Sequence, residues 1–270
     1  MFGRERIEIK TPAQVLTMRR AGLLTHAALE SARSAIRPGV TTRELDGIAA
    51  EVIRAGGGTS NFLGYHGYPA TLCISVNHVV VHGIPGEQVL REGDVVSVDG
   101  GAVVDGWHGD SAFTQIVGEP AEEADVELVE TTRRAMWAGI AALDRRGRVG
   151  DVGAAVEDAV DGRFAIVDGY TGHGIGSAMH MAPEVLNHRV RERGPKVRPG
   201  MCLAVEPMCT RGGDETDVLA DEWTVVTTDG ARAAHWEHTV AVLEEGLWVL
   251  TAPDGGASEL GPLGIAVPGE

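Results

Sequence analysis

Four carboxylates stand at or next to apolar, strand-like stretches of this 270-residue sequence. They are Asp99, Asp110, Glu206 and Glu237. An acid that ends a strand flanked by helices is unfavourable there unless it has a partner. Four converging acids would repel one another and raise one another's pKa unless cations neutralise them, as two divalent metals do. Each acid alone is better explained as a surface residue or a salt bridge with arginine, but the four together favour a metal site.

Three histidines could complete such a site. His173 lies in Gly172-His173-Gly174-Ile175-Gly176, where glycines let the backbone pack closely, and it could supply the nitrogen ligand that Mn, Fe, Co or Zn accepts. His82 ends a strand before a turn, and His180 lies seven residues past His173. Beside two metals, His82 and His180 could hydrogen-bond a substrate amide and a tetrahedral oxyanion. Each histidine taken singly is explained as well by a place in a loop or in the core.

Helices and short strands must position these residues. Thr11-Pro12 predicts the N-terminus of a long helix that Arg37-Pro38-Gly39 ends, and Thr41 with Glu44 predicts a capping box for a second helix that ends at Gly56. Two further helices are expected at 123–143 and 152–160. Short β-branched stretches predict strands at 71–76, 78–82, 95–99, 202–206, 223–228 and 239–243.

An internal repeat relates the two halves of the chain. A shift of 107 residues superposes Asp99 on Glu206 and His66-Gly67 on His173-Gly174, and about twenty extra residues in the second half then align Asp110 with Glu237. This predicts an α+β fold built from a duplicated unit of two helices followed by antiparallel strands. We expect a single catalytic domain over residues 1–270, with halves at about 11–118 and 123–251. The Gly- and Pro-rich segment 253–270 is expected to be a loose C-terminal tail.

Composition excludes several classes of protein. The net charge of −16 argues against nucleic-acid or anionic-membrane binding, and no apolar run is long enough to span a bilayer. The N-terminus has no secretory signal, and the three cysteines form no CxxC pair, so we expect a cytoplasmic protein without disulfides. The sequence has no P-loop, no GxSxG elbow and only a weak match to the spacing of dinucleotide-binding glycines.

The motifs together resemble the type I methionine aminopeptidase family, over roughly Ile9 to Thr251. The stretches that carry the resemblance are Gly64-Tyr65-His66-Gly67-Tyr68-Pro69, His82-Gly83-Ile84-Pro85, Asp99, the Trp107-His108-Gly109-Asp110 turn, Gly172-His173-Gly174-Ile175-Gly176, Ala204-Val205-Glu206-Pro207-Met208 and Glu237-His238-Thr239. The resemblance implies the pita-bread fold, whose pseudo-twofold halves match the repeat. It also implies two divalent cations (Co, Mn, Fe or Zn) held by Asp99, Asp110, His173, Glu206 and Glu237.

The resemblance also implies the role of each residue. Asp110 and Glu237 would bridge the metals, Asp99 would chelate one of them, and the remaining two ligands would complete the other. Glu206 would carry the proton to the leaving amine, His180 would stabilise the tetrahedral intermediate, and His82 would contact the amide of the second residue. The methionine side chain would enter a pocket built from Phe62, Tyr65, Tyr68, Cys73, Met179, His180 and Trp223.

The expected substrates are peptides and nascent chains with an N-terminal methionine and a small second residue, met near the ribosome by a monomer. Phe62 and Met179 stand where bacterial relatives often carry a small residue and a phenylalanine, and His78 stands where an acid is common. An Xaa-Pro aminopeptidase or dipeptidase of the same fold is the alternative enzyme, although such relatives carry a large N-terminal domain for which there is no room before Thr11. A metal-free binding protein on this fold is the other alternative, but such relatives have lost ligands.

Overall fold

The two helices of the first half begin at capping boxes. The computed structural model describes residues 6–268, and in it helix α1 (Pro12–Ala35) follows Thr11, whose hydroxyl accepts a hydrogen bond from the amide of Gln14 while the Gln14 side chain caps the amide of Thr11. Thr41 and Glu44 make the same reciprocal pair at the start of α2 (Thr42–Ala55). Both boxes occupy amides that a helix start leaves without partners, so both predicted N-termini are confirmed.

The helices of the second half occupy the predicted positions, but their ends are held differently. They are α3 (Glu123–Ala142) and α4 (Asp151–Val160), and neither begins with a side-chain cap. Instead, Asp125 in the first turn of α3 is fully buried and accepts hydrogen bonds from Arg211 and Arg232. These ion pairs tie the start of α3 to the segment around the second-half strands, because a buried carboxylate requires such partners.

The central feature is a nine-stranded antiparallel sheet ordered β1-β4-β5-β14-β9-β7-β8, with β2 added to β4 and β15 to β14. Its members are β1 (Thr59–Ser60), β2 (Leu72–Val76), β4 (Val95–Val104), β5 (Trp107–Ile116), β7 (Gly172–Gly174), β8 (Met181–Val185), β9 (Cys202–Val205), β14 (Glu237–Val242) and β15 (Leu247–Val249). Two three-stranded sheets flank it. They contain β13 (Ala233–His235), β10 (Met208–Thr210) and β6 (Ala165–Ile166), and β11 (Thr216–Val218), β12 (Val225–Thr227) and β3 (Val79–Val81).

A pseudo-twofold axis passes between β5 and β14, the strands at which the two halves meet. Ser111 pairs with His238 across this seam, and the repeat that superposes Asp110 on Glu237 makes these same two residues equivalent. The seam is also joined by hydroxyls, since Ser111 donates to the carbonyl of Glu237 and Thr239 donates to that of Asp110. Two positions that are equivalent by the repeat therefore lie opposite each other, as a twofold axis requires.

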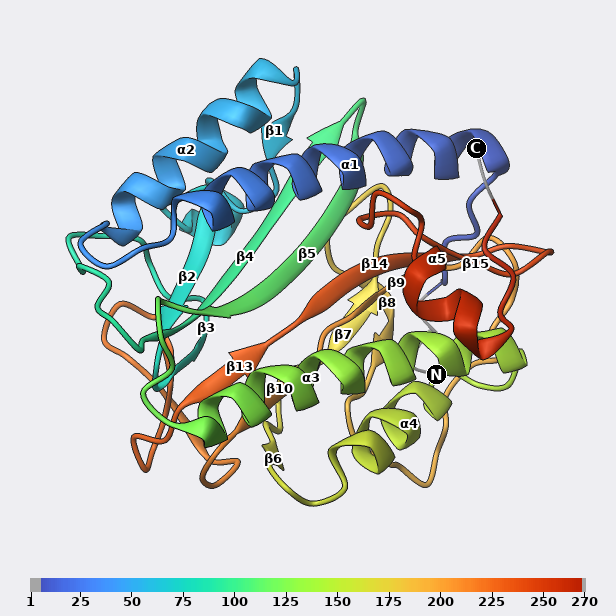
Figure 1. Ribbon diagram of the computed structural model, residues 1–270. Helices are drawn as coiled ribbons and strands as arrows, with labels where there is room; N and C mark the ends of the chain where they lie inside the picture. Colours follow the sequence, from blue (N-terminus) through green and yellow to red (C-terminus); the bar gives the residue numbers. More distant parts are fainter. Residues whose placement is uncertain (1–5, 269–270) are drawn as a thin grey trace.

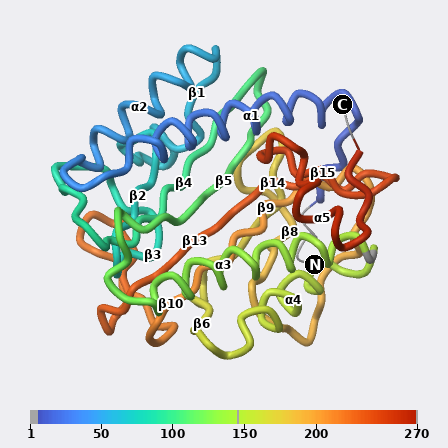
Figure 2. Tube along the Cα trace, viewed as in Figure 1, coloured from blue at the N-terminus to red at the C-terminus, as the bar shows by residue number. Residues whose placement is uncertain are grey.

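Helices cover one face of the central sheet. In Figure 1, α1 and α3 run across the front of the sheet with β5 and β14 visible between them, and α2 and α4 lie outside these long helices. Figure 2 shows the blue and green trace of the first half on one side of the seam and most of the yellow and red trace on the other. The hairpin of β11 and β12 is the exception, because β12 pairs with β3 of the first half.

Two predicted boundaries are wrong near the site. The stretch Trp107-His108-Gly109-Asp110 is the start of the ten-residue strand β5, whereas a turn was expected, because the real turn lies at Asp105-Gly106, where both residues have positive φ. Asp99 lies inside β4 rather than at its end, since the strand continues to Val104. Gly109 fits within β5 because α1 crosses it so closely that a Cβ there would lie 2.7 Å from the amide nitrogen of Gly22.

The expectation of a loose C-terminal tail is wrong for the described residues, and 269–270 lie outside them. Residues 257–263 form α5 (Ala257–Leu260) and the short helix η3 (Gly261–Leu263), and Leu260 is fully buried in the second-half core. Asp254 accepts hydrogen bonds from the amides of Gly256 and Ser258. A buried leucine and satisfied backbone groups hold this segment in place. Its high glycine content led to the expectation of a loose tail.

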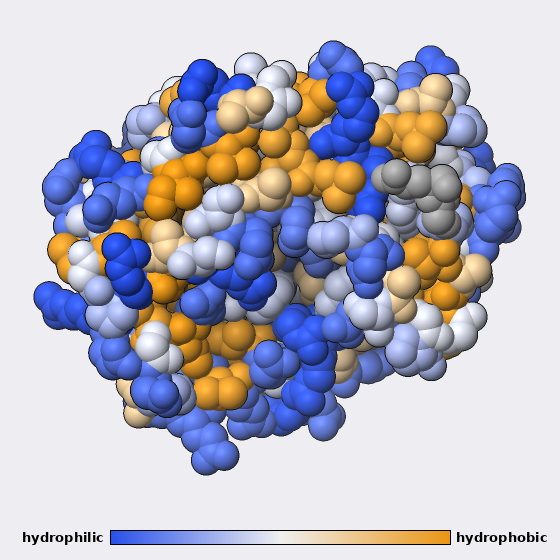
Figure 3. Space-filling model, turned by 45° about the horizontal axis from the view of Figure 1, so that its top comes forward, coloured by the Kyte–Doolittle hydropathy of each residue, from blue (hydrophilic) through white to orange (hydrophobic). Residues whose placement is uncertain are grey.

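The tail also closes one side of a cavity of about 570 Å³ between α1 and α3, on the helix-covered face. Figure 3 shows this side of the molecule with hydrophilic residues around a central hollow. Ser111 and His238 line this cavity, so their neighbours Asp110 and Glu237 point to the opposite face of the sheet, because successive residues of a strand alternate between faces.

Candidate metal centre

One cavity gathers every side chain that the sequence nominated. It has a volume of about 90 Å³ and lies on the face of the central sheet that the long helices do not cover. Its lining residues are Phe62, Tyr65, Tyr68, Cys73, His82, Asp99, Asp110, His173, Met179, His180, Glu206, Trp223 and Glu237. They come from both halves of the chain, so the cavity exists only when the two halves are assembled.

Strand register brings the four acids onto one face. Asp99 pairs with Ala112 across β4 and β5, and Glu237 pairs with the same alanine across β5 and β14. Asp110 lies two residues from Ala112 and therefore points to the same face. In the second half, the pairing of Val205 with His238 places the next residue, Glu206, opposite Glu237.

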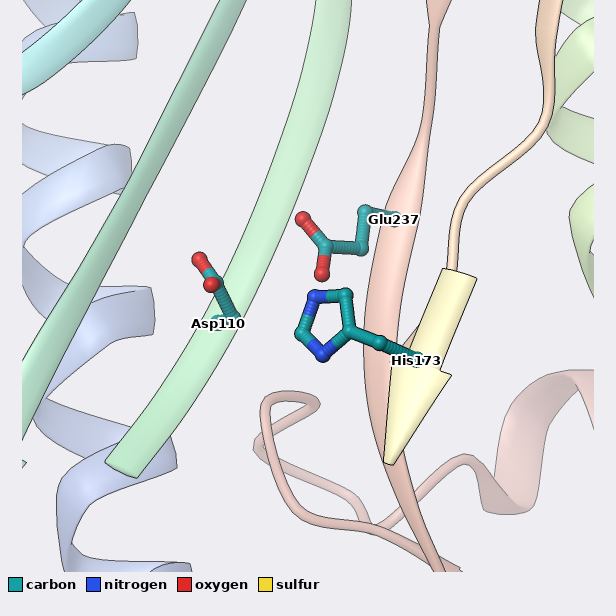
Figure 4. A group of neighbouring side chains, drawn as sticks. All are labelled: Asp110, His173 and Glu237. Atoms are coloured by element: carbon teal, nitrogen blue, oxygen red, sulfur yellow. The ribbon is translucent and has the colours of Figure 1, made fainter. Parts of the chain in front are cut away.

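The centre of the cavity has the donor set of a metal site. Figure 4 shows the side chains of His173 and Glu237 extending from β7 and β14 toward β5, on which Asp110 lies. One ligand atom from each of the three lies within 4.8 Å of the others. Oxygen donors with one imidazole suit Mn, Fe, Co and Zn.

The acids have no protein cation to neutralise them. No lysine or arginine of residues 6–268 lines the cavity. Burial raises the pKa of Asp110 to about 7, and burial followed by mutual repulsion raises the pKa values of Asp99, Glu206 and Glu237 well above their usual range. One oxygen each of Asp99, Asp110 and Glu237 is buried without a hydrogen-bond partner among the described residues. Divalent cations fit this arrangement, because they would both neutralise the acids and give these oxygens a partner.

His173 presents a lone pair to the site. Its Nδ1 lies 3.0 Å from the carbonyl oxygen of Gly174 and donates to it, so Nε2 carries no proton in the neutral ring. Burial lowers the pKa of His173 to about 3, which keeps the ring neutral. Nε2 lies 3.3 Å from Oε1 of Glu206. Two acceptors face each other at this distance, and a bound cation would satisfy both.

The glycines around His173 let β7 fit between its neighbours. A Cβ on Gly172 would lie 2.3 Å from the carbonyl oxygen of Ala204, and one on Gly174 would lie 2.2 Å from that of Ala182. Any larger residue would push β7 away from β8 or β9. The glycine-rich stretch expected to expose the imidazole is therefore a tightly packed strand that aims it.

The other end of the cavity is apolar and rigid. Phe62, Tyr68, Cys73 and Met179 are buried together, with Trp223 packed against them. The rings of Phe62 and Tyr68 meet edge to face at 6.3 Å, and those of Tyr68 and Trp223 at 5.0 Å. The Tyr68 hydroxyl is taken up by two backbone carbonyls, so the walls offer an apolar side chain aromatic edges and sulfur.

His180 and His82 flank the mouth of this cavity. The Nδ1 of His180 lies 2.8 Å from the Tyr65 hydroxyl, and its ring packs edge to face on His173 at 4.5 Å. His82 has a positive φ of 59°, and its ring lies between those of Tyr170 and Trp223. Burial lowers the pKa of His82 to about 4 and also lowers that of His180, so both rings are neutral near pH 7.

One aligned histidine lies outside the site, and another that the sequence did not single out lies beside it. His66, which the repeat superposes on His173, is exposed in the short helix η1 (Tyr65–Gly67) and does not line the cavity. His235 in β13 is 2% exposed, and its Nε2 lies 3.7 Å from Oε2 of Glu206. The alignment of His108-Gly109-Asp110 with His235-Trp236-Glu237 was the signal for His235, since both place a histidine two residues before an acid.

Comparisons with known proteins identify the family of the chain. The model of metallopeptidase family M24 matches residues 17–244. A protein named methionine aminopeptidase 1 from Mycobacterium tuberculosis is 49% identical over 257 residues, covering 92% of this chain and 96% of that protein. The methionine aminopeptidase structure from Thermotoga maritima superposes with a TM-score of 0.88 at 40% identity, covering 91% of this chain and 99% of that one.

A more distant neighbour bears on the fold alone. Prolidase from Pyrococcus furiosus superposes with a TM-score of 0.73 at 20% identity, covering 90% of this chain and 65% of that one. The pita-bread fold predicted from the sequence is confirmed by these neighbours together with the curved antiparallel sheet and its pseudo-twofold halves.

Proposed function

We propose that this chain, which belongs to metallopeptidase family M24, removes N-terminal methionine with two divalent cations held by Asp99, Asp110, His173, Glu206 and Glu237. The family and the methionine aminopeptidase activity follow from identities of 40–49% over about nine-tenths of the chain. The observation that carries the metal centre is the cluster of four acids without a protein cation, three of which have a buried oxygen that lacks a partner.

The acids and His173 would bind the cations from strands β4, β5, β7 and β14 and from the end of β9. Asp110 and Glu237 lie on either side of the seam and would share both ions, Asp99 would hold one, and His173 with Glu206 would hold the other. Bound cations would lower the pKa of water and polarise the scissile carbonyl. The protein contributes fixed ligand positions, because three of the acids lie on strands of the central sheet and Glu206 directly follows β9.

Residues at the mouth of the metal cavity would transfer the proton and stabilise the oxyanion. Glu206 would take the proton from the attacking water and pass it to the leaving amine. When the Tyr65 hydroxyl donates to Nδ1 of His180, the proton of the neutral imidazole lies on Nε2. That N–H can then donate a hydrogen bond to the tetrahedral oxyanion. His82 would contact the amide of the second residue.

Substrate choice would come from the shape of the two sides of the site. The methionine side chain would enter the apolar end between Phe62, Tyr68 and Trp223, where its flexible thioether meets aromatic edges. The second residue would lie beside His82, where a large side chain would push the carbonyl away from attack, and small displacements are costly in rate. We therefore expect cleavage before Gly, Ala, Ser, Thr, Cys, Pro or Val and poor cleavage before Lys, Leu or Phe.

A second, open cavity gives a long substrate a path to solvent. It has a volume of about 700 Å³ and shares His82, His173, His180 and Glu206 with the metal cavity. A peptide whose first residue occupies the apolar end could leave through it, so we propose that peptides and nascent chains are the substrates. No helix within residues 6–268 is long and apolar enough to cross a membrane. We propose that the protein acts as a monomer in the cytoplasm, near the ribosome.

A peptide panel tests this function. After chelation, the protein is supplied with Mn, Co, Fe or Zn and assayed on Met-Ala, Met-Lys and Xaa-Pro peptides. We expect activity to return with metal and kcat/KM for Met-Ala to exceed that for Met-Lys by about 100-fold. Full activity in metal-free protein, checked by elemental analysis, would overturn the metal centre. A preference for Xaa-Pro would favour the alternative enzyme class instead.

A further inference from the structure

A buried imidazole lies behind the acid that is proposed to move the proton. His235 is 2% exposed and does not line the metal cavity. Its Nε2 has no hydrogen-bond partner within residues 6–268 and no contact with solvent. The group that it faces is Oε2 of Glu206, at 3.7 Å. A buried polar nitrogen without a partner is costly, so its presence beside this carboxylate calls for an explanation.

The position of His235 is fixed by its backbone. Its amide donates to Oγ1 of Thr114, and its carbonyl accepts from the same hydroxyl at 2.7 Å. In the small sheet, His235 pairs with Met208, two residues beyond Glu206. This register places His235 diagonally across from Glu206, a spacing that long side chains span.

The ring can offer Glu206 one hydrogen. A neutral imidazole carries a proton on one of its two nitrogens. A lone pair on Nε2 would repel the carboxylate oxygen that it faces, whereas an N–H there attracts it. The tautomer with the proton on Nε2 is therefore the favourable one.

We propose that His235 is a positioning residue that donates from Nε2 to Oε2 of Glu206 and thereby keeps Oε1 turned toward His173. The proposal rests on the proposed function, because it assigns Glu206 as a ligand. The gap of 3.7 Å is longer than a hydrogen bond, but the torsion that turns a glutamate carboxylate is soft. Asn187 holds the main chain at this point by donating to the carbonyl of Glu206 at 3.1 Å, so the carboxylate can turn while its backbone stays fixed.

The first half has no counterpart of this contact. His108 is the residue equivalent to His235, but its Nδ1 lies 2.9 Å from Oδ1 of Asn61. One oxygen of Asp99, the acid equivalent to Glu206, has no partner. Support from an imidazole thus reaches only the acid that must exchange a proton during the reaction. Partners behind a metal ligand fix its orientation, and their loss typically weakens metal binding or activity about 10–100-fold.

Two substitutions separate positioning from packing. His235→Leu removes the donor and keeps an apolar side chain of similar reach, whereas His235→Gln keeps an N–H at a similar position. Calorimetric titration of the chelated protein with Mn²⁺ should show metal binding weakened about 10–100-fold in His235→Leu and largely restored in His235→Gln. Circular dichroism of the chelated protein should show both variants folded, so that a change in Mn²⁺ binding reports the loss of the donor rather than the loss of the fold. His66→Leu makes the same exchange outside the cavity and should bind Mn²⁺ as the parent does.

The same substitution in a Glu206→Gln background tests whether the effect passes through Glu206. There, His235→Leu should weaken Mn²⁺ binding no further, since coupled residues are not additive. Equal losses in both backgrounds, or equal losses in the leucine and glutamine variants, would overturn the positioning role. Unchanged Mn²⁺ binding in His235→Leu would overturn it as well and leave the proposed function standing. Failure of the parent protein to bind Mn²⁺ would instead overturn both.

Discussion

The two halves share a scaffold but place their acids in different registers. In the first half, Asp110 lies two residues along β5 from Ala112, the partner of Asp99, so the two acids are diagonal neighbours. In the second half, the register places Glu206 directly opposite Glu237. Diagonal neighbours are about 7–8 Å apart and opposite ones about 5 Å, so the shorter aspartates and longer glutamates reach the same centre from different pairings. Each half thus contributes two charges by its own geometry.

The halves differ more in what surrounds the acids. The first-half segment that contains His66 forms one wall of the apolar end through Phe62, Tyr65 and Tyr68, and His66 itself is exposed. The equivalent second-half segment is β7, which aims His173 at the acids. The duplicated sheet therefore positions charge in both halves, whereas this pair of equivalent segments has diverged. The first-half segment forms one wall of the apolar end, and the second-half segment carries His173, the proposed nitrogen ligand.

The largest expected effect tests whether Asp110 and Glu237, the equivalent acids on either side of the seam, contribute equally to activity. Asp110→Asn and Glu237→Gln should each lower kcat/KM for Met-Ala about 1000-fold or more, because each would remove a charge that the two proposed cations share, and metal activation is worth several kcal/mol. Elemental analysis should find less than the full metal content in both variants, and circular dichroism should find both folded. A variant that keeps its metal and most of its activity would show that the two acids are not equivalent.

His180→Ala is expected to lower kcat about 10²–10³-fold with metal still bound, the scale for losing one oxyanion donor. His66→Ala is the matched control, because both imidazoles pack edge to face on Tyr65 and only His180 lines the cavity. Stopped-flow or steady-state assays with elemental analysis measure both variants. Equal losses would mean that packing on Tyr65, rather than hydrogen bonding at the site, accounts for the effect.

The amount by which bound metal raises the free energy of unfolding should grow between about pH 5 and pH 7.5. In the chelated protein, the raised pKa of Asp110, about 7, means that the folded state holds a proton that the unfolded chain has released above about pH 4. Stability from this group is therefore present at low pH and lost as the pH rises through 7, and the three other acids act in the same direction. Metal removes this loss because it binds the deprotonated acids.

Melting curves with and without Mn²⁺ across this range measure that effect. At a metal concentration near 100 times Kd, the stabilisation is about 2.7 kcal/mol, which raises Tm by roughly 5–10 °C in a protein of this size. The difference between the two curves cancels the contribution of buried groups that metal binding does not affect. A difference that shrinks as the pH rises would contradict raised pKa values in the acid cluster.

The smallest expected effect separates the first-half pocket from the second-half chemistry. Phe62→Cys enlarges the apolar end, so KM for peptides with a bulkier analogue, such as ethionine, should fall several-fold, since one methylene in an apolar pocket is worth about 1–3 kcal/mol. Metal content should be unchanged, because Phe62 packs in the apolar cluster with Tyr68, Cys73 and Met179 and is not a proposed ligand. Loss of metal in this variant would show that the apolar pocket and the metal ligands depend on each other.

The sequence predicted the site better than the strands that carry it. Capping boxes, β-branched runs and the repeat are local or periodic signals, and they located four helices and the four acids. Strand β5 was missed because Trp107-His108-Gly109-Asp110 has the composition of a turn, and the reason for its strand conformation is tertiary, since its partners lie on both sides of it.

His235 and the tail show the same limit. Nothing near His235 in the sequence says that Glu206 lies beside it, because β13 and β10 meet only in the fold. The tail has few apolar residues, and its order depends on one of them, Leu260, fitting into a core made by distant segments. Contacts between residues far apart in sequence leave no local pattern.

The pairing of Ser111 with His238 on the axis makes the chain equivalent to a symmetric dimer whose subunits are joined end to end. The join is the short exposed segment 118–122 between β5 and α3. An ordinary dimer with its active site at the subunit interface loses that site on dilution, whereas tethered halves meet at an effective concentration that dilution cannot change. Because the two halves are separate parts of one chain, their sequences can also differ. The segment around His66 can therefore form a wall of the apolar end while the equivalent segment holds His173 toward the acids, a division that two copies of a single sequence could not make.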